Sequence, residues 1–275
     1  KKKGYSTRVK SGKYAIYKGS SNNEIINSLR LGNIPVRVTF NNIERIENLA
    51  GRVSKQIFLD SLKLLESFLD LKFLSEKGFS ISEALCMYLP NTYEFFWNCS
   101  VEDFRNKLWK NYIKFWTEER LEKANKIGLK PKEVIILASI IQKETHNIDE
   151  RPKIAGVYIN RLKRNMRLQA DPTVVYSIKK NNNKFDTIIK RVLYQDLKVK
   201  SPFNTYQNKG LPPSPISMPD ISSITSVLNY EKHKFIYFVA NPYSEGYHLF
   251  ATNSLNHAKN KKIYTDWLNS KKIYR

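Results

Sequence analysis

The sequence has few cysteines, and its glycines are widely spaced. Cys86 and Cys99 are the only cysteines in 275 residues, too few for a zinc ribbon or a disulfide framework. We expect two buried or half-buried thiols, although the two could pair in an oxidising compartment. The ten glycines are at least seven residues apart. This excludes the glycine-rich phosphate loops of dinucleotide enzymes and P-loop NTPases, and also the nucleophile elbow of serine hydrolases.

The sequence also lacks a metal-binding pattern and a long hydrophobic run. None of its four histidines forms an H-E-x-x-H motif or a pair at helical metal-ligand spacing, so we expect no metal and no cofactor. The longest strongly apolar run covers the eight residues 134–141, whereas a membrane helix needs about 20. We therefore expect no membrane span or signal peptide in these residues. Because the chain starts at Lys1 without Met, we expect that an N-terminal segment has been removed.

Acidic residues are scarce compared with basic ones. The chain has 25 Asp and Glu against 47 Lys and Arg, a formal net charge of +22. Such a surplus calls for an anionic partner: nucleic acid, an anionic membrane face or an acidic polymer. Hydrophobic residues make up 41%, too many for a disordered chain. The basic first 13 residues are either a solvated lead-in or a juxtamembrane segment near anionic headgroups.

The first 40 residues predict a small β-α-β unit. We expect a strand at 13–17, a helix that Ser20 or Ser21 caps and Gly32 ends, and an alternating strand at 35–40. Such a unit is too small to have its own core and must pack against other residues.

The rest of the chain predicts a mixed, helix-rich domain, so we expect the α+β fold class. An aromatic segment with Pro90, residues 87–97, interrupts a helical pattern over 43–125. The helices and the hairpin predicted after it are 132–146, 154–162, a short helix after Pro172, the strands 235–240 and 247–250, and a closing helix at 253–268. The stretch 202–219 holds five of the eleven prolines and predicts a long, stiff loop, which in other proteins is functional or disordered.

Glu144 is the most informative acidic residue. Val134, Leu137, Ala138 and Ile141 form an apolar helical stripe, and Glu144 lies at its edge. A carboxyl there loses hydration, so its pKa rises towards the range of a general acid at neutral pH. The alternative is a glutamate at a helix end, paired with Arg151 or another cation.

Polar loops follow this helix. They carry amides, hydroxyls, prolines and aromatic rings, which suit a neutral ligand rich in hydroxyl and amide groups, such as an N-acetylated sugar. They lie at 158–162, 167–176, 204–206 and 210–216.

In order and spacing, residues 140–250 resemble the endolytic murein transglycosylases of the MltG or YceG-like type. The resemblance rests on LASIIQKET (137–145), VYINRL (157–162), MRLQADPTVVY (166–176), NTY (204–206), GLPP (210–213), PI (215–216), YFVA (237–240) and HLF (248–250). Upstream, LPNTYEF (89–95) is similar to the family's P-D-T-Y segment, with the uncharged Asn91 in place of the usual Asp.

The resemblance implies the domain organisation. Residues 1–40 would be a LysM-like subdomain. Residues 41–275 would be the YceG-like catalytic domain, with a helical part at 41–130 and a catalytic core at 131–275 that contains the C-terminal hairpin. The family also carries an N-terminal membrane helix, so the resemblance implies that this helix was removed from the residues given.

The resemblance also implies the active site. The family's catalytic glutamate is the last acid of an E-K-E-T motif, which corresponds to Glu144. Gln142 replaces the first acid, so Glu144 is the only carboxylate of the motif. Asp171 is the most plausible second carboxylate, although a cap for the helix after Pro172 is the favoured reading. The expected substrate-binding residues are Tyr93, Asn160, Arg161, Gln169, Asp171, Thr173, Tyr176, Asn204, Thr205, Tyr206, Pro212, Pro213 and His248.

The implied activity is a lyase reaction on the cell wall. A lytic transglycosylase cleaves peptidoglycan between N-acetylmuramic acid and N-acetylglucosamine, leaves 1,6-anhydro ends, and here would terminate glycan elongation. Its partners would be glycan strands, the anionic membrane surface through the missing anchor, and peptidoglycan synthases, with no nucleic acid. It would be a single-pass protein of the bacterial cytoplasmic membrane, with this domain on the outer or periplasmic face.

Three other functions stay open at this point. One is a hydrolytic muramidase that uses Asp171 as the partner of Glu144, because a conventional glycosidase needs two carboxyl groups. Another is a basic nucleic-acid-binding protein, which would gather its Lys and Arg on one face. In this sequence the basic residues are instead spread over the N-terminus, residues 151–200 and the C-terminus. The third is a non-catalytic scaffold that binds murein.

Overall fold

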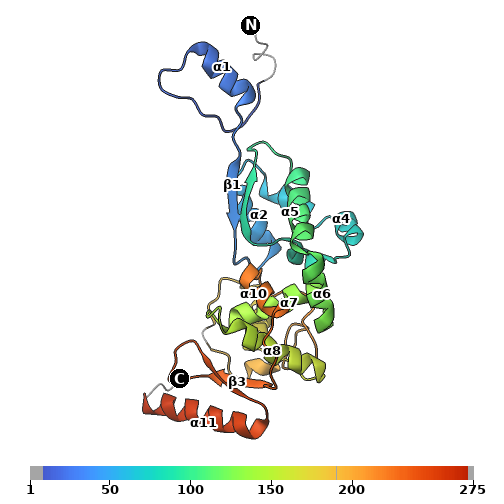
Figure 1. The fold of residues 1–275 in the computed structure, drawn as a ribbon, viewed down its shortest axis with the longest axis vertical. Helices are drawn as coiled ribbons and strands as arrows, with labels where there is room; N and C mark the ends of the chain where they lie inside the picture. Colours follow the sequence, from blue (N-terminus) through green and yellow to red (C-terminus); the bar gives the residue numbers. More distant parts are fainter. Residues whose placement is uncertain (1–8, 190, 272–275) are drawn as a thin grey trace. The chain divides into compact units, whose positions relative to one another are not determined.

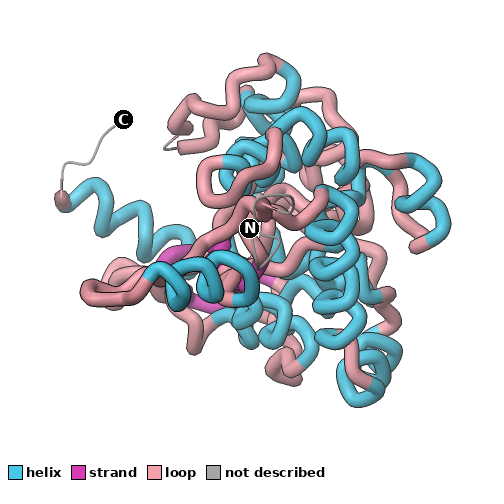
Figure 2. The backbone as a smooth tube through the Cα atoms, turned by 90° about the horizontal axis from the view of Figure 1, so that it is seen from above, coloured by secondary structure: helices cyan, strands magenta, loops and turns pink. Residues whose placement is uncertain are grey.

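The computed structural model describes residues 9–189 and 191–271 and divides into two units, Lys1–Lys114 and Phe115–Arg275 (Figure 1). Helices, cyan in Figure 2, are the main regular elements of the described structure, and the strands are short. The expected α+β class is confirmed. The two units divide after Lys114, not at residue 40. The expected domain boundary at residue 40 and the LysM-like nature of residues 1–40 stay predictions.

The first unit combines short helices with one antiparallel strand pair. Its elements are α1 (Asn22–Leu31), β1 (Val36–Phe40), α2 (Ile46–Ser54), α3 (Ser61–Phe68), α4 (Leu71–Glu76), the 3₁₀ helix η2 (Ile81–Met87), β2 (Asn91–Phe95) and α5 (Val101–Phe115). Helix α1 begins as predicted: Ser21 and Glu24 form a reciprocal capping box, which satisfies two free N–H groups. The helix ends at Gly32, as expected.

The expected strand at 13–17 is wrong. Those residues are not in a strand; instead, β1 pairs with β2, with Val38 opposite Tyr93. In sequence, residues 91–95 stand out only as part of an aromatic interruption, but their burial alternates as in a strand: Tyr93 and Phe95 are buried like Val38 and Phe40. The pairing therefore follows from two matching apolar faces that are distant in sequence.

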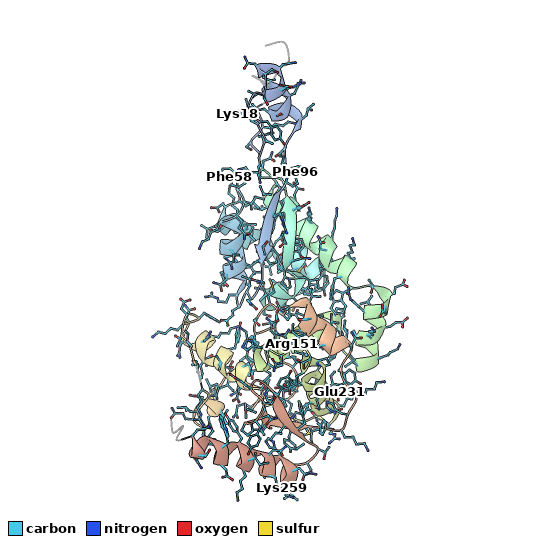
Figure 3. All side chains as sticks on the ribbon, turned by 60° about the vertical axis from the view of Figure 1, so that its left-hand side comes forward. Lys18, Phe58, Phe96, Arg151, Glu231 and Lys259 are labelled. Atoms are coloured by element: carbon cyan, nitrogen blue, oxygen red, sulfur yellow. The ribbon has the colours of Figure 1, made fainter. Side chains whose placement is uncertain are left out.

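Aromatic rings fill the core of the first unit. Phe95 stacks on Phe104 with ring centroids 4.2 Å apart, and Phe68 lies 4.7 Å from Tyr88. Cys86 is buried and Cys99 half-buried, both as free thiols, as expected. At an exposed edge of this unit, Figure 3 shows Phe58 and Phe96, whose exposed fractions are 72% and 51%.

The second unit is built around α7, which is buried along most of its length. Its elements are α6 (Glu118–Ile127), α7 (Pro131–Glu144), α8 (Arg151–Lys163), α9 (Asp171–Asn181), the 3₁₀ helix η3 (Asp196–Lys198), α10 (Ile221–Leu228), β3 (Tyr237–Ala240), β4 (His248–Ala251) and α11 (Ser254–Ser270). The side chains from Val134 to Gln142 are all buried, which is typical of a helix surrounded by other elements. Helices α8, α9 and α10 pack against it.

The predicted hairpin and closing helix are confirmed. Strands β3 and β4 pair antiparallel, with Val239 opposite Leu249. Helix α11 lies along this hairpin (Figure 1), and the rings of Tyr237 and His257 stack 4.9 Å apart. Within the described residues, no helix has the length and apolar character needed to cross a bilayer.

Candidate active site

Glu144 is the last residue of α7, and its carboxyl meets a tyrosine from α8. The chain turns after Thr145, whose backbone is extended, and returns as α8, so that Tyr158 reaches Glu144. The Tyr158 hydroxyl donates a hydrogen bond of 2.5 Å to Oε1 of Glu144. Tyr158 is almost fully buried, whereas Glu144 as a residue is half-buried. The carboxyl is therefore held by a donor that is fixed within the protein.

The surroundings of Glu144 raise the pKa of its carboxyl to about 7, and burial is the main cause. The hydrogen bond from Tyr158 opposes this rise because it favours the charged form. Asp171 raises the pKa further by charge repulsion, whereas His248 and Arg161 lower it. Near neutral pH the carboxyl therefore exists in both forms and can donate and accept a proton, as a general acid-base group must.

Asp171 forms a second pair of a carboxylate and a tyrosine in the same neighbourhood. The Tyr206 hydroxyl donates to Oδ1 of Asp171 at 2.6 Å. The expected capping role of Asp171 is wrong: Ala170 occupies the N-cap of α9 without a side-chain cap, and Asp171 is the first helical residue. Burial, together with this bond, raises the pKa of Tyr206 above its usual range, so its hydroxyl stays a donor.

His248 reaches the site from β4, and Glu150 holds it in place. Oε2 of Glu150 lies 2.7 Å from Nδ1 of the His248 ring, and Oε1 accepts the backbone N–H of His248 at 2.8 Å. Glu150 is 6% exposed. Glu150 therefore holds His248 by both its ring and its backbone, and this orients a side chain that acts on the charge of Glu144.

Arg151 does not pair with Glu144, although that was the alternative to catalysis. It begins α8, where Figure 3 labels it, and donates to the Ser222 hydroxyl at 2.8 Å and to the Thr145 carbonyl. Its hydrogen bonds thus connect the end of α7 to α10.

Arg161 supplies positive charge from within the protein. It is buried and donates to the carbonyls of Ile236 and Leu168, both at 2.6 Å, and to Oε1 of Gln169 at 3.4 Å. Gln169 is exposed, has φ of +51°, and its backbone N–H donates to the Thr205 carbonyl. Arg161 therefore stabilises the hairpin and the loop before α9 while it acts on Glu144.

Four expected substrate-binding residues use their polar atoms inside the protein. The Asn160 amide donates to the carbonyls of His233 and Phe235, and the Asn204 amide to two carbonyls of the 197–199 segment. The hydroxyls of Thr173 and Thr205 meet at 2.8 Å. These bonds hold the loops around the site, and contact of these residues with a substrate stays a prediction.

The other expected residues occupy varied positions. Tyr93 lies in the first unit, where its hydroxyl donates to the Leu89 carbonyl at 2.7 Å and burial raises its pKa to about 12. Tyr176 packs against Phe203 with ring centroids 4.7 Å apart. Pro212 is buried and Pro213 exposed. Substrate binding by these four residues also stays a prediction.

Three residues that shape the site have no role predicted from the sequence. Tyr158 and Glu150 are described above. The prediction that residues 158–162 form a polar loop is wrong: they lie in α8, and this helix carries Tyr158 to Glu144. Gln142, on α7, is buried and accepts hydrogen bonds from the Asp220 backbone and the Ser223 hydroxyl at the start of α10. Across the described ranges, no three potential metal-ligating side chains are grouped together.

Comparison with known proteins finds relatives that share one name. The chain is 34% identical over 230 residues to an endolytic murein transglycosylase of Bacillus subtilis, a match that covers 82% of this chain and 60% of that protein. A protein of the same name from Streptococcus pneumoniae is 34% identical over 128 residues, covering 46% of this chain and 23% of its own length. The chain thus spans less than two thirds of these relatives.

Structure and family comparisons extend the match over most of the chain. The crystal structure of a YceG-like protein from Listeria monocytogenes superposes with a TM-score of 0.68 and 28% identity, covering 94% of this chain and 86% of that one. The model of the YceG-like family matches residues 1–263. The chain, with Glu144 at the end of its central helix, therefore belongs to the YceG-like family.

Proposed function

We propose that this protein is an endolytic lytic transglycosylase that cleaves peptidoglycan glycan strands between N-acetylmuramic acid and N-acetylglucosamine. The observation that carries the proposal is Glu144, the last residue of the motif helix, whose carboxyl accepts a hydrogen bond from Tyr158 and has its pKa raised to about 7 by burial. The name of the Bacillus and Streptococcus relatives supports the same activity. Termination of glycan elongation would be the consequence of cutting within a growing strand.

The reaction needs one group that first gives and then takes a proton. Protonated Glu144 donates to the glycosidic oxygen as the bond to the anomeric carbon breaks. The resulting carboxylate takes the proton of the muramyl 6-hydroxyl as that oxygen bonds to the same carbon, so the product is a 1,6-anhydro end and no water is consumed. Because the nucleophile belongs to the substrate, its approach can lower the barrier by about 7–11 kcal/mol.

A hydrolytic muramidase is the second candidate, and one observation favours it. Asp171 is an exposed carboxylate that acts electrostatically on Glu144, and two carboxyl groups are what a conventional glycosidase needs. In that case water would end on the anomeric carbon, and the product would carry a reducing end.

Mass spectrometry of digested murein tests the proposal. The unchanged protein should release fragments with anhydro ends, and Glu144→Gln should lose at least a thousandfold in rate while still binding glycan. Glu133→Gln is the matched control. Glu133 lies in the first turn of the same helix, where its carboxylate accepts the backbone N–H of Lys130. Fragments that carry an added water would refute the lytic reaction and support the muramidase.

The cell-envelope setting is also a proposal. We infer that the domain works on the outer or periplasmic face of the bacterial cytoplasmic membrane, close to its anionic surface, next to peptidoglycan synthases. The basic surplus of +22 supports an anionic surface, and the relatives' name supports murein as the substrate.

A further inference from the structure

The hydrogen bond from Tyr158 makes the two oxygens of Glu144 unequal. Oε1 accepts the phenol proton at 2.5 Å. The tyrosine ring is 1% exposed and meets the edge of the Phe238 ring, with centroids 5.8 Å apart. Packing on α8 therefore fixes the donor, which in turn fixes one oxygen of the acid.

We propose that Tyr158 is a positioning residue that anchors Glu144 through Oε1, so that Oε2 alone carries and transfers the catalytic proton. The inference rests on the proposed function. Tyr158 itself would touch neither the glycosidic oxygen nor the 6-hydroxyl.

The number of protons shared by Glu144 and Tyr158 decides which oxygen of the acid is protonated. Burial and the neighbouring Glu144 raise the pKa of Tyr158 well above its usual range, so the phenol keeps its proton and remains a donor at neutral pH. A protonated carboxyl has a single O–H, and a proton on Oε1 would compete with the phenol for the same oxygen. The proton of Glu144 therefore belongs on Oε2.

Both proton transfers then pass through one oxygen. Oε2–H gives its proton to the glycosidic oxygen, whose bond to the anomeric carbon breaks. Oε2 next accepts the proton of the 6-hydroxyl while O6 bonds to that carbon. Glu144 returns to its starting form, one C–O bond has been exchanged for another, and the bond between Tyr158 and Oε1 persists throughout.

The charged groups that face Glu144 come from several elements and act in opposite directions. Arg161 on α8 and His248 on β4 favour the carboxylate, whereas Asp171 on α9, which holds Tyr206, favours the acid. The bond from Tyr158 favours the carboxylate. Removing that bond should therefore raise the pKa of Glu144, and removing the Asp171 charge should lower it.

The pH dependence of kcat/KM on purified glycan strands tests the inference in the full chain. Activity requires protonated Glu144 and falls above its pKa. In Tyr158→Phe, which removes only the hydroxyl, this alkaline limb should move up by about one pH unit or more, and kcat should fall at least tenfold with little change in KM. In Asp171→Asn the limb should move to lower pH. Tyr230→Phe, which removes a surface hydroxyl near Lys163, should move nothing.

Two further measurements keep the outcome decisive. A carbon-13 NMR titration of Glu144 in the unchanged protein and in Tyr158→Phe reads the pKa without activity, so it decides on Tyr158 even if the murein digest yields no anhydro ends. If Tyr158→Phe does not fold, a fluorinated tyrosine at 158, a stronger donor of the same shape, should move the limb to lower pH. A rate loss without any movement of the limb or of the titration would overturn the inference and leave Tyr158 a packing residue.

Discussion

At Glu144, two physical effects oppose each other on a single carboxyl. Burial disfavours its charge, and the hydrogen bond from Tyr158 favours it. The effect of burial is the larger, so the pKa rises to about 7. In an exposed carboxylate, the same hydrogen bond would lower the pKa. Asp171, which accepts a hydrogen bond from Tyr206, raises this pKa further, and His248, which is held by Glu150, lowers it.

This balance makes a prediction about stability. The pKa of Glu144 is higher in the folded chain than its ordinary value of 4.5, so the free energy of unfolding falls as pH rises from about 4.5 to 7 and then stays low. Glu144→Gln cannot ionise and can still accept from Tyr158. It should be more stable than the unchanged protein by about 1–3 kcal/mol at pH 8, with little difference at pH 4.

Thermal or denaturant unfolding at several pH values measures this difference. Glu133→Gln, on the half-buried first turn of the same helix, serves as the control and should show no such pH-dependent gain. A Glu144→Gln protein that is less stable than the unchanged chain at pH 8 would show that ionised Glu144 is well accommodated.

Among the elements, α8 supplies two of the residues that act on Glu144. One face brings Tyr158 and Arg161 towards Glu144, while Asn160 holds the chain that leads into β3. Gly156 lies on the same helix, against the segment after α10. That segment is anchored here, because the backbone N–H of Glu231, labelled in Figure 3, donates to the Pro152 carbonyl at 2.9 Å.

We expect Gly156→Ala to disturb this packing. A methyl group at 156 would collide with the Glu231 carbonyl and would lie 2.6 Å from Nε2 of His233. Overpacking of this kind costs about 1–3 kcal/mol of unfolding free energy. Gly51→Ala is a matched control in α2, because nothing lies within 4 Å of the added methyl, and it should stabilise by up to about 1 kcal/mol. Chemical denaturation of both variants checks the prediction, and equal effects would contradict it.

At the scale of the whole molecule, the chain carries a net charge of +22. Exposed charges are screened within about 8 Å at physiological ionic strength. The basic surplus should therefore attract the protein to an anionic envelope surface without determining which sugars enter the site, where Glu144 has both positive and negative neighbours.

Salt dependence separates these two contributions. Binding of the Glu144→Gln protein to vesicles rich in anionic lipid should weaken at least tenfold between about 50 and 300 mM salt, because the attraction is screened. Uncharged vesicles should bind it little at either concentration. Sedimentation with vesicles measures this, and tight, salt-resistant binding would point to an apolar contact instead.

Most of the local structure could be predicted from the sequence, because it depends on neighbours within a few residues. The capping of α1 by Ser21, the apolar periodicity of α7 and the two strands of the hairpin are all visible in short segments. The same periodicity placed Glu144 at the edge of a buried face. The β1–β2 pairing could not be found in this way, since Thr39 meets Thr92 across 53 residues of chain.

What the sequence by itself determined was the acid: its position on the helix, its motif and the family it resembles. Only the tertiary structure decided the partners of that acid. Tyr158 comes from the next helix, and Glu150 fixes His248, which lies 98 residues later in the chain. Asp171, expected to cap a helix, instead accepts a hydrogen bond from Tyr206. Burial and hydrogen bonding between distant segments set the pKa of Glu144, and neither can be read from residues that are neighbours only in sequence.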